Sequence, residues 1–127
     1  MTSAEKAISI LPAADMTSAV AQIIATLRER GGLKGVDVAN IAAVSPATVS
    51  RWTSGAALPH PKTQLIISDL RYVVDRLSEL YTPEETRVWL YSKHHLLGGE
   101  RAIDLIHDGR TDKVLEVIES LDQGSYT

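Results

Sequence analysis

The chain has 127 residues, a formal net charge of −3 and no cysteine. The lack of cysteine excludes a disulfide framework, a thiolate nucleophile and a cysteine-based zinc site. No apolar run approaches the roughly 18 residues of a membrane span, and the first residues lack the apolar region of a signal peptide. We therefore expect a cytoplasmic protein that does not contact a membrane.

The N-terminal residues 1–16 show no sustained periodicity, and we interpret them as a loosely ordered arm. A helix is predicted to begin at Thr17, whose hydroxyl can act as an N-cap, and to end at the glycine pair Gly31-Gly32. Its apolar residues share one helix face and are Val20, Ile23, Ile24 and Leu27.

The next apolar residues predict a short helix that contains Val38. Ile41 and Ala42 follow Val38 at the i+3 and i+4 spacing of one helix face. The small residues Ala39 and Ala43 would let this helix cross the following one closely. We expect the helix to be buried along that face.

A second short helix is predicted from Pro46 to a terminator at Gly55. Ser45 can cap it through its hydroxyl, and proline is favoured at the first helical position because its missing N–H costs little there. Val49 and Trp52 lie three residues apart and are expected to turn inward. Gly55 can adopt the left-handed conformation that ends the helix.

This pair of helices resembles the helix-turn-helix of the phage-repressor-like (Xre/Cro) family. The matching residues are Ala39, Val44, Ser45, Val49, Trp52, Gly55 and Leu58-Pro59. The chain departs from the family at Ala43, where a glycine is usual, and an ordinary helical hairpin would show a similar pattern. The resemblance implies that 46–54 is a recognition helix that binds operator DNA.

The candidate DNA-binding residues lie on and beside this helix. They are Lys34, Pro46, Ala47, Thr48, Ser50, Arg51 and Thr53. Among them only Arg51 could make the bidentate contact with guanine that is common in direct readout, whereas the hydroxyl side chains could bind phosphates or touch a thymine methyl group. Each position could equally belong to a solvated helix face.

The charge of the chain is unevenly distributed. Residues 20–62 contain five basic and two acidic residues, whereas residues 63–127 contain seven basic and twelve acidic ones. Because phosphate binding scales with the number of basic contacts, so weakly basic a helix-turn-helix is expected to act as a homodimer. The acidic half is either a solvated surface or a surface for another partner.

A longer helix is predicted to follow His60-Pro61 and to run to about Tyr81. Its apolar residues alternate at spacings of four and three, and are Ile66, Leu70, Val73, Leu77 and Leu80. This narrow seam either packs on the chain's own helices or forms a dimer contact. We therefore treat residues 63–81 as a connecting or dimerisation helix.

The sequence Thr82-Pro83-Glu84-Glu85 predicts another helix start, because it combines a capping box with proline at the first helical position. This helix carries Val88 and Trp89 as its apolar residues. Residues 92–100 show no helical period and are interpreted as a loop anchored by Leu96 and Leu97.

Two short helices are predicted to complete the chain. The first carries Ile103, Leu105 and Ile106 and stops near Gly109. The second is capped by Thr111, stops near Gly124, and carries Val114, Leu115, Ile118 and Leu121. Because no segment combines strand alternation with turn residues, we predict an all-α fold in which a helix-turn-helix bundle (17–62) precedes a small C-terminal helical domain (82–127).

The C-terminal pattern resembles the toxin-binding domain of Xre/MbcA/ParS-type antitoxins, which carry it after a helix-turn-helix. The resemblance depends on Trp89, Leu96-Leu97-Gly98-Gly99, Asp104-Leu105-Ile106, Gly109 and Gly124. The chain has Lys93-His94 where relatives often have Pro-Asn, and Ala102 where they often have proline. With both blocks present in this order, the resemblance extends from about Thr17 to the end of the chain.

The resemblance implies a bacterial antitoxin whose partner is a RES-domain toxin, an enzyme that degrades NAD or transfers ADP-ribose from it. Such an antitoxin covers the toxin's active-site cleft and represses its own operon. The implied toxin-binding residues are Trp89, Lys93, His94, His95, Leu96, Leu97, Gly98, Gly99, Gly124, Ser125, Tyr126 and Thr127.

We find no constellation that indicates catalysis, a cofactor or a metal. His94 and His95 are neighbours that cannot share one helix face, and the glycine pairs are better interpreted as helix terminators than as a phosphate-binding loop. We therefore expect a protein that is not an enzyme. The alternative to an antitoxin is a free-standing repressor whose C-terminal half dimerises or senses a ligand.

Overall fold

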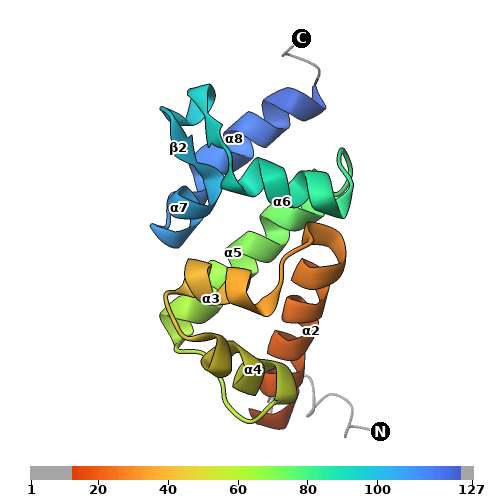
Figure 1. The fold of residues 1–127 in the computed structure, drawn as a ribbon, viewed down its shortest axis with the longest axis vertical. Helices are drawn as coiled ribbons and strands as arrows, with labels where there is room; N and C mark the ends of the chain where they lie inside the picture. The colour runs from red at the N-terminus through yellow and green to blue at the C-terminus, as the bar shows by residue number, and fades with distance from the viewer. Residues whose placement is uncertain (1–12, 124–127) are drawn as a thin grey trace, which may run out of the picture.

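A computed structural model of the chain describes residues 13–123, and its ribbon is drawn in Figure 1. The described part is mostly helical and contains only one two-stranded sheet, which confirms the predicted all-α fold. The elements are α2 (Ala13–Gly31), α3 (Gly35–Ala42), α4 (Pro46–Ser54), α5 (Pro61–Leu77), α6 (Pro83–Tyr91), β1 (Lys93–His94), the 3₁₀ turn η1 (His95–Leu97), β2 (Glu100–Arg101), α7 (Ala102–His107) and α8 (Thr111–Asp122).

The long helix α5 connects the two ends of the molecule. Figure 1 shows α2, α3 and α4 around one end of α5, and α6, α7, α8 and the hairpin around the other. Helix α5 packs on α2 and α3 as well as on α7 and α8. One apolar core therefore runs through both groups of helices, and the division of the chain into domains stays a prediction.

Helix α2 begins at Ala13, four residues before the predicted start at Thr17. The prediction was wrong because residues 13–16 include alanines and a methionine, which favour a helix without needing a cap. The predicted end is confirmed: α2 ends at Gly31, and Gly32 has a φ of 62°. A Cβ atom on Gly32 would lie 2.7 Å from the Pro83 carbonyl oxygen, so glycine also permits close contact with α6.

The two helices of the predicted helix-turn-helix are present. The Thr48 backbone N–H donates to the Ser45 hydroxyl over 3.2 Å, and Gly55 closes α4 in the left-handed conformation. Val49 and Trp52 are buried, as predicted. Ala43 has a φ of 60°, a conformation that an L-residue adopts at a cost, which agrees with the glycine usual at this position.

Helix α5 ends at Leu77, whereas the sequence predicted a helix to about Tyr81. Residues 78–80, which were predicted to be helical, form a turn, because the capping box that follows them starts a new helix in another direction. Leu70, Val73 and Leu77 are fully buried among the chain's own helices. The first interpretation of the seam, packing within the monomer, is therefore the one that the structure supports.

The C-terminal half differs from the prediction in residues 92–100. The predicted loop is a small antiparallel hairpin in which Lys93 pairs with Arg101 and His94 with Glu100. Gly98 and Gly99 have φ values of 70° and 83° and form the tight reversal between the strands. Each strand has only two residues, so the sequence shows no alternation of apolar and polar residues.

The capping box of α6 is confirmed by two hydrogen bonds between Thr82 and Glu85, of 2.9 and 3.2 Å. The predicted cap of α8 is wrong, because Thr111 is the first helical residue and its hydroxyl donates to Asp69 over 3.0 Å. The predicted stop at Gly109 is confirmed by its φ of 79°, whereas the predicted stop at Gly124 lies outside the described residues.

Candidate functional site

The candidate recognition helix α4 presents most of the predicted DNA-binding residues to solvent. Thr48 is half-buried, and the others are exposed: Pro46, Ala47, Ser50, Arg51, Thr53 and, ahead of α3, Lys34. Val49 and Trp52 fix the other face of α4 in the core. The helix is therefore held from within and leaves its polar face uncovered.

Local hydrogen bonds order this polar face. The hydroxyls of Ser45 and Thr48 lie 2.9 Å apart, and the Thr53 hydroxyl donates to the Val49 carbonyl over 3.0 Å. Arg51 reaches the Thr48 hydroxyl at 3.5 Å and forms no ion pair with any residue in 13–123. Its guanidinium group is thus free to bind an acceptor outside the chain.

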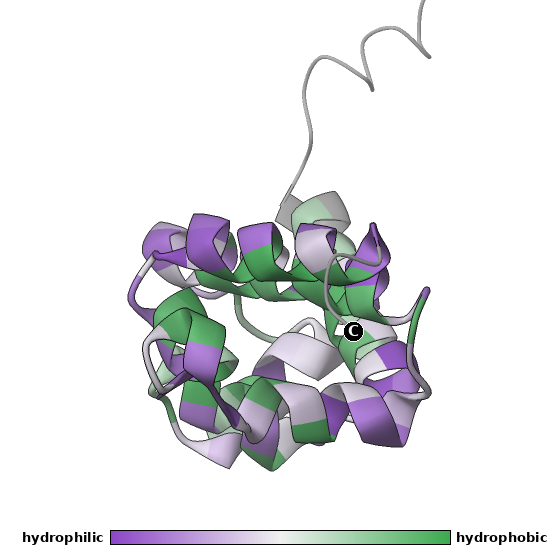
Figure 2. Ribbon diagram, turned by 90° about the horizontal axis from the view of Figure 1, so that it is seen from above, coloured by the Kyte–Doolittle hydropathy of each residue, from purple (hydrophilic) through white to green (hydrophobic). Residues whose placement is uncertain are grey.

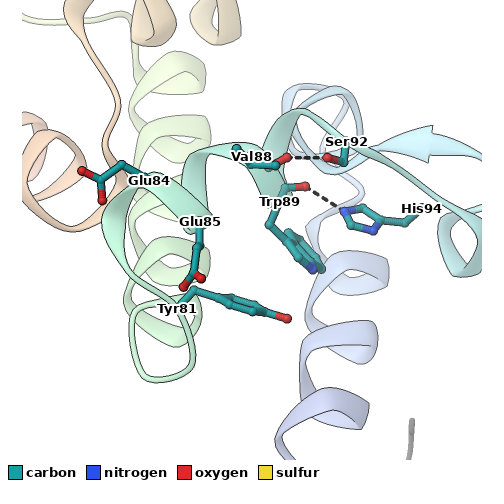
Figure 3. A pocket seen from close by; sticks show the side chains of 7 residues that line it. All are labelled: Tyr81, Glu84, Glu85, Val88, Trp89, Ser92 and His94. Carbon is teal, nitrogen blue, oxygen red and sulfur yellow. Dashed lines mark hydrogen bonds between the residues drawn. The ribbon is translucent and has the colours of Figure 1, made fainter.

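A second candidate surface lies at the end of α6 and on the hairpin. The rings of Trp89 and His94 contact each other at a tilt of 35° with their centroids 4.3 Å apart, and His94 Nε2 lies 2.7 Å from the Trp89 carbonyl oxygen (Figure 3). This contact ties the hairpin to α6. It places two of the predicted toxin-binding residues side by side.

The remaining predicted residues of the loop differ in exposure. Lys93, His95, Gly98 and Gly99 are exposed, and Leu96 is 51% exposed. Leu97 is only 6% exposed because it packs into the core, so its prediction as a contact residue is not supported. The other predicted residues, Gly124, Ser125, Tyr126 and Thr127, lie outside the described residues.

An apolar hollow of about 390 Å³ adjoins this surface and was not predicted. Its lining residues are Tyr81, Glu84, Glu85, Val88, Trp89, Ser92 and His94. Val88 had been predicted as an apolar residue of its helix, yet it is 61% exposed while Leu90 is buried. The sequence could have suggested that Val88 is exposed, because the buried residues Thr86 and Leu90 lie four residues apart on the face of α6 opposite to Val88.

A buried carboxylate joins the helix-turn-helix to α6. Asp37 on α3 is 2% exposed and accepts hydrogen bonds from the Lys34 backbone N–H at 2.7 Å, the Tyr91 hydroxyl at 2.6 Å and Arg87 Nη2 at 3.0 Å. The Arg87 guanidinium also lies over the Tyr91 ring, 4.7 Å from its centroid. Sequence reasoning missed this cluster because its members are about fifty residues apart and individually ordinary.

The hydrogen bonds decide how this cluster titrates. Burial raises the pKa of Asp37, but the donors from Tyr91, Lys34 and Arg87 together outweigh it and hold the pKa below its ordinary value. Burial, together with donation to the Asp37 carboxylate, raises the pKa of Tyr91 to about 12. The ion pair and the neutral phenol are therefore the stable forms near neutral pH.

Within residues 13–123, no cluster of three histidine or acidic side chains is arranged to hold a metal ion. None of the helices there is both long enough and apolar enough to cross a lipid bilayer.

Comparison with known proteins places the chain in a family. No family model matches it. It is 34% identical over 98 residues to the mycobacterial cidal antitoxin MbcA of Mycobacterium tuberculosis, a match that covers 77% of this chain and 87% of the relative. It is 36% identical over 95 residues to a probable mycobacterial cidal antitoxin of the same species, covering 75% of this chain and 81% of that protein.

A solved structure supports the same relationship. The chain matches the crystal structure of the M. tuberculosis MbcT–MbcA toxin–antitoxin complex with a TM-score of 0.75 and 32% identity, over 84% of this chain and 96% of the matched one. Sequence and fold thus agree over more than three quarters of the chain. The chain belongs to the family of the mycobacterial cidal antitoxin MbcA.

Proposed function

We propose that this chain is the antitoxin of a toxin–antitoxin pair and neutralises a cognate toxin by binding it. The observation that supports this most directly is the match to MbcA, which was crystallised in complex with the toxin MbcT. In this proposal the C-terminal half binds the toxin. Its contact residues are Trp89, Lys93, His94, His95, Leu96, Gly98 and Gly99, joined by the segment 124–127.

The proposed toxin is a RES-domain enzyme that consumes NAD, and the antitoxin covers its active-site cleft. The support is the sequence resemblance to Xre/MbcA/ParS-type antitoxins, together with charge. Residues 63–127 carry twelve acidic and seven basic residues. A cleft that binds the phosphates of NAD is expected to be basic, so opposite charge would speed the encounter of the two proteins.

We also propose that the protein represses its own operon as a homodimer. The exposed polar face of α4, with Arg51 free of ion pairs among the described residues, supports contact with operator DNA. With few basic residues in its N-terminal half, one copy would bind phosphates weakly, so two copies on two half-sites are needed. This function is regulatory and requires no catalysis by the chain.

Co-expression with the toxin from the adjacent gene tests the proposed function. We expect the full chain to relieve the growth arrest and to purify together with the toxin, and the mass of the complex to give its stoichiometry. A chain ending at Gln123 should rescue growth less well while it retains DNA binding. Full rescue by the shortened chain would remove 124–127 from the site. A free-standing repressor would neither rescue growth nor co-purify.

A further inference from the structure

Helix α6 presents two different faces. Arg87 and Tyr91, on one face, turn toward Asp37 of α3 and anchor α6 to the helix-turn-helix. Glu84 and Val88, four residues apart, lie in another row that lines the hollow described above. The first face is anchored to α3 through Asp37, whereas Glu84 and Val88 are exposed and form no contact of this kind with any other described residue.

Two aromatic groups in this hollow have polar atoms without a partner among the described residues. Figure 3 shows the rings of Tyr81, from the turn after α5, and of Trp89, from α6, on the same side of α6. Neither the Tyr81 hydroxyl nor the Trp89 indole N–H forms a hydrogen bond with a residue in 13–123, although both side chains are half-buried. Half-buried tyrosine and tryptophan with unused donors are typical of protein interfaces.

The acidic residues at the hollow favour a partner with basic residues. Glu84 and Glu85 are exposed and form no ion pair with any other described residue, and the lining contains no lysine or arginine. A second copy docking symmetrically here would set these carboxylates against their own equivalents. An occupant with basic residues beside an apolar side chain would instead be attracted.

We propose that this hollow receives a large apolar side chain of the cognate toxin, flanked there by lysine or arginine. The proposal rests on the proposed antitoxin function and names the chemistry of its docking site. A volume of about 390 Å³ is enough for one aromatic or leucine-sized side chain. Val88 contributes most of the exposed aliphatic surface, and the hollow continues the Trp89–His94 surface that we propose for toxin binding.

Val88→Arg tests the docking site, because it fills the hollow with a side chain of the wrong size and charge. Val88 is 61% exposed, so the substitution leaves the core intact, which circular dichroism verifies. We expect the affinity for purified cognate toxin, measured by calorimetry, to fall at least about tenfold, as is common for a buried anchor. The matched control is Val36→Arg on α3, where valine is 49% exposed, and it should bind the toxin within about twofold of the wild type.

Glu84→Gln tests the charge component separately. We expect association with the toxin to slow about two- to fivefold at low salt and to depend less on ionic strength, because a rim charge acts mainly on the encounter rate. An unchanged rate at every salt concentration would overturn the requirement for a basic flank.

The possible outcomes separate the two proposals. If wild-type protein does not bind the toxin, the proposed function fails. If the wild type binds and Val88→Arg binds equally well, the hollow is not the docking site, but the proposed function stands. If Val88→Arg changes only the mass of the free antitoxin, the occupant is a second copy and the inference is overturned.

Discussion

At the scale of single residues, the fold depends on a few polar groups in special environments. Asp37 is the clearest, since its carboxylate accepts from three donors contributed by the α3 start and by α6. A buried charge is tolerated only when its hydrogen bonds are satisfied. An amide in its place keeps one oxygen acceptor, turns an N–H group toward the remaining donors and leaves Arg87 without its counter-ion. At Ala43 the special feature is the backbone, whose φ of 60° is unfavourable for an L-residue.

Asp37→Asn is expected to destabilise the protein by about 2 to 4 kcal/mol, because it replaces a buried carboxylate acceptor by a neutral amide. Urea unfolding followed by circular dichroism measures this. Asp104→Asn is the control, since Asp104 pairs with Arg101 on the surface and its loss should cost less than about 1 kcal/mol. Equal effects of the two substitutions would show that the Asp37 cluster does not hold the halves together.

The stability should fall at alkaline pH through Tyr91. Its pKa in the folded chain is raised from 10.0 to about 12, so its contribution is complete below pH 10 and is lost as the pH rises toward 12. Unfolding free energies measured across this range should decline for the wild type. They should decline less for Tyr91→Phe, which has no phenol to ionise, and identical slopes would contradict the assignment.

Ala43→Gly is expected to stabilise the protein by about 0.5 to 1 kcal/mol, because glycine adopts a φ of 60° without steric cost. Ala39→Gly is the matched control: Ala39 lies inside α3, where glycine should destabilise by about 1 kcal/mol. Thermal unfolding of both variants measures whether each substitution raises or lowers the stability. A loss of stability in both variants would refute strain at Ala43.

At the scale of elements, the starts of α4 and α6 were predictable because each depends on a local cap, whereas the starts of α2 and α8 were not. Ser45 and Thr82 cap α4 and α6 through hydrogen bonds within four residues, and such spacings are visible in a sequence. Elements fixed by distant contacts were not predictable. Thr111 bonds Asp69 instead of capping α8, and the hairpin of residues 93–101 is too short to show alternation.

Arg51 on the candidate recognition helix α4 is proposed to contact a base of the operator. Arg51→Ala should weaken operator binding by about 1 to 3 kcal/mol if Arg51 contacts a guanine, and the loss should be larger on the operator than on unrelated DNA. Mobility-shift assays measure both. Arg71→Ala on α5, which removes an exposed arginine outside the helix-turn-helix, serves as the control. An unchanged shift would remove Arg51 from the proposed site.

At the scale of the whole molecule, the predicted candidate sites were only partly visible in the sequence. The exposed face of α4 follows from helical spacing, because Val49 and Trp52 fix which side is buried. The hollow beside α6 does not, because it depends on how Tyr81 and Trp89 are brought together by a turn. Figure 2, coloured by hydropathy and seen from above, shows apolar segments turned toward the interior of the molecule. The buried core contains residues from both groups of helices, so the two halves share one core.

This shared core links the two proposed activities physically. Asp37 connects α3 with α6, and His107 of α7 contacts the Ile41 carbonyl of α3, so the proposed toxin surface and the recognition helix are attached to the same interior. Acidic residues of α8 also pair with Arg76 of α5, at 3.3 Å for Asp122. A protein built in this way presents both proposed surfaces from one shared core.

The proposed function requires that the chain inhibit a toxin by occupying the toxin's active site. The most direct measurement titrates purified chain into purified cognate toxin and follows the consumption of NAD. We expect consumption to fall in proportion to added antitoxin and to stop at a fixed molar ratio. Undiminished consumption in the presence of excess antitoxin would contradict the claim.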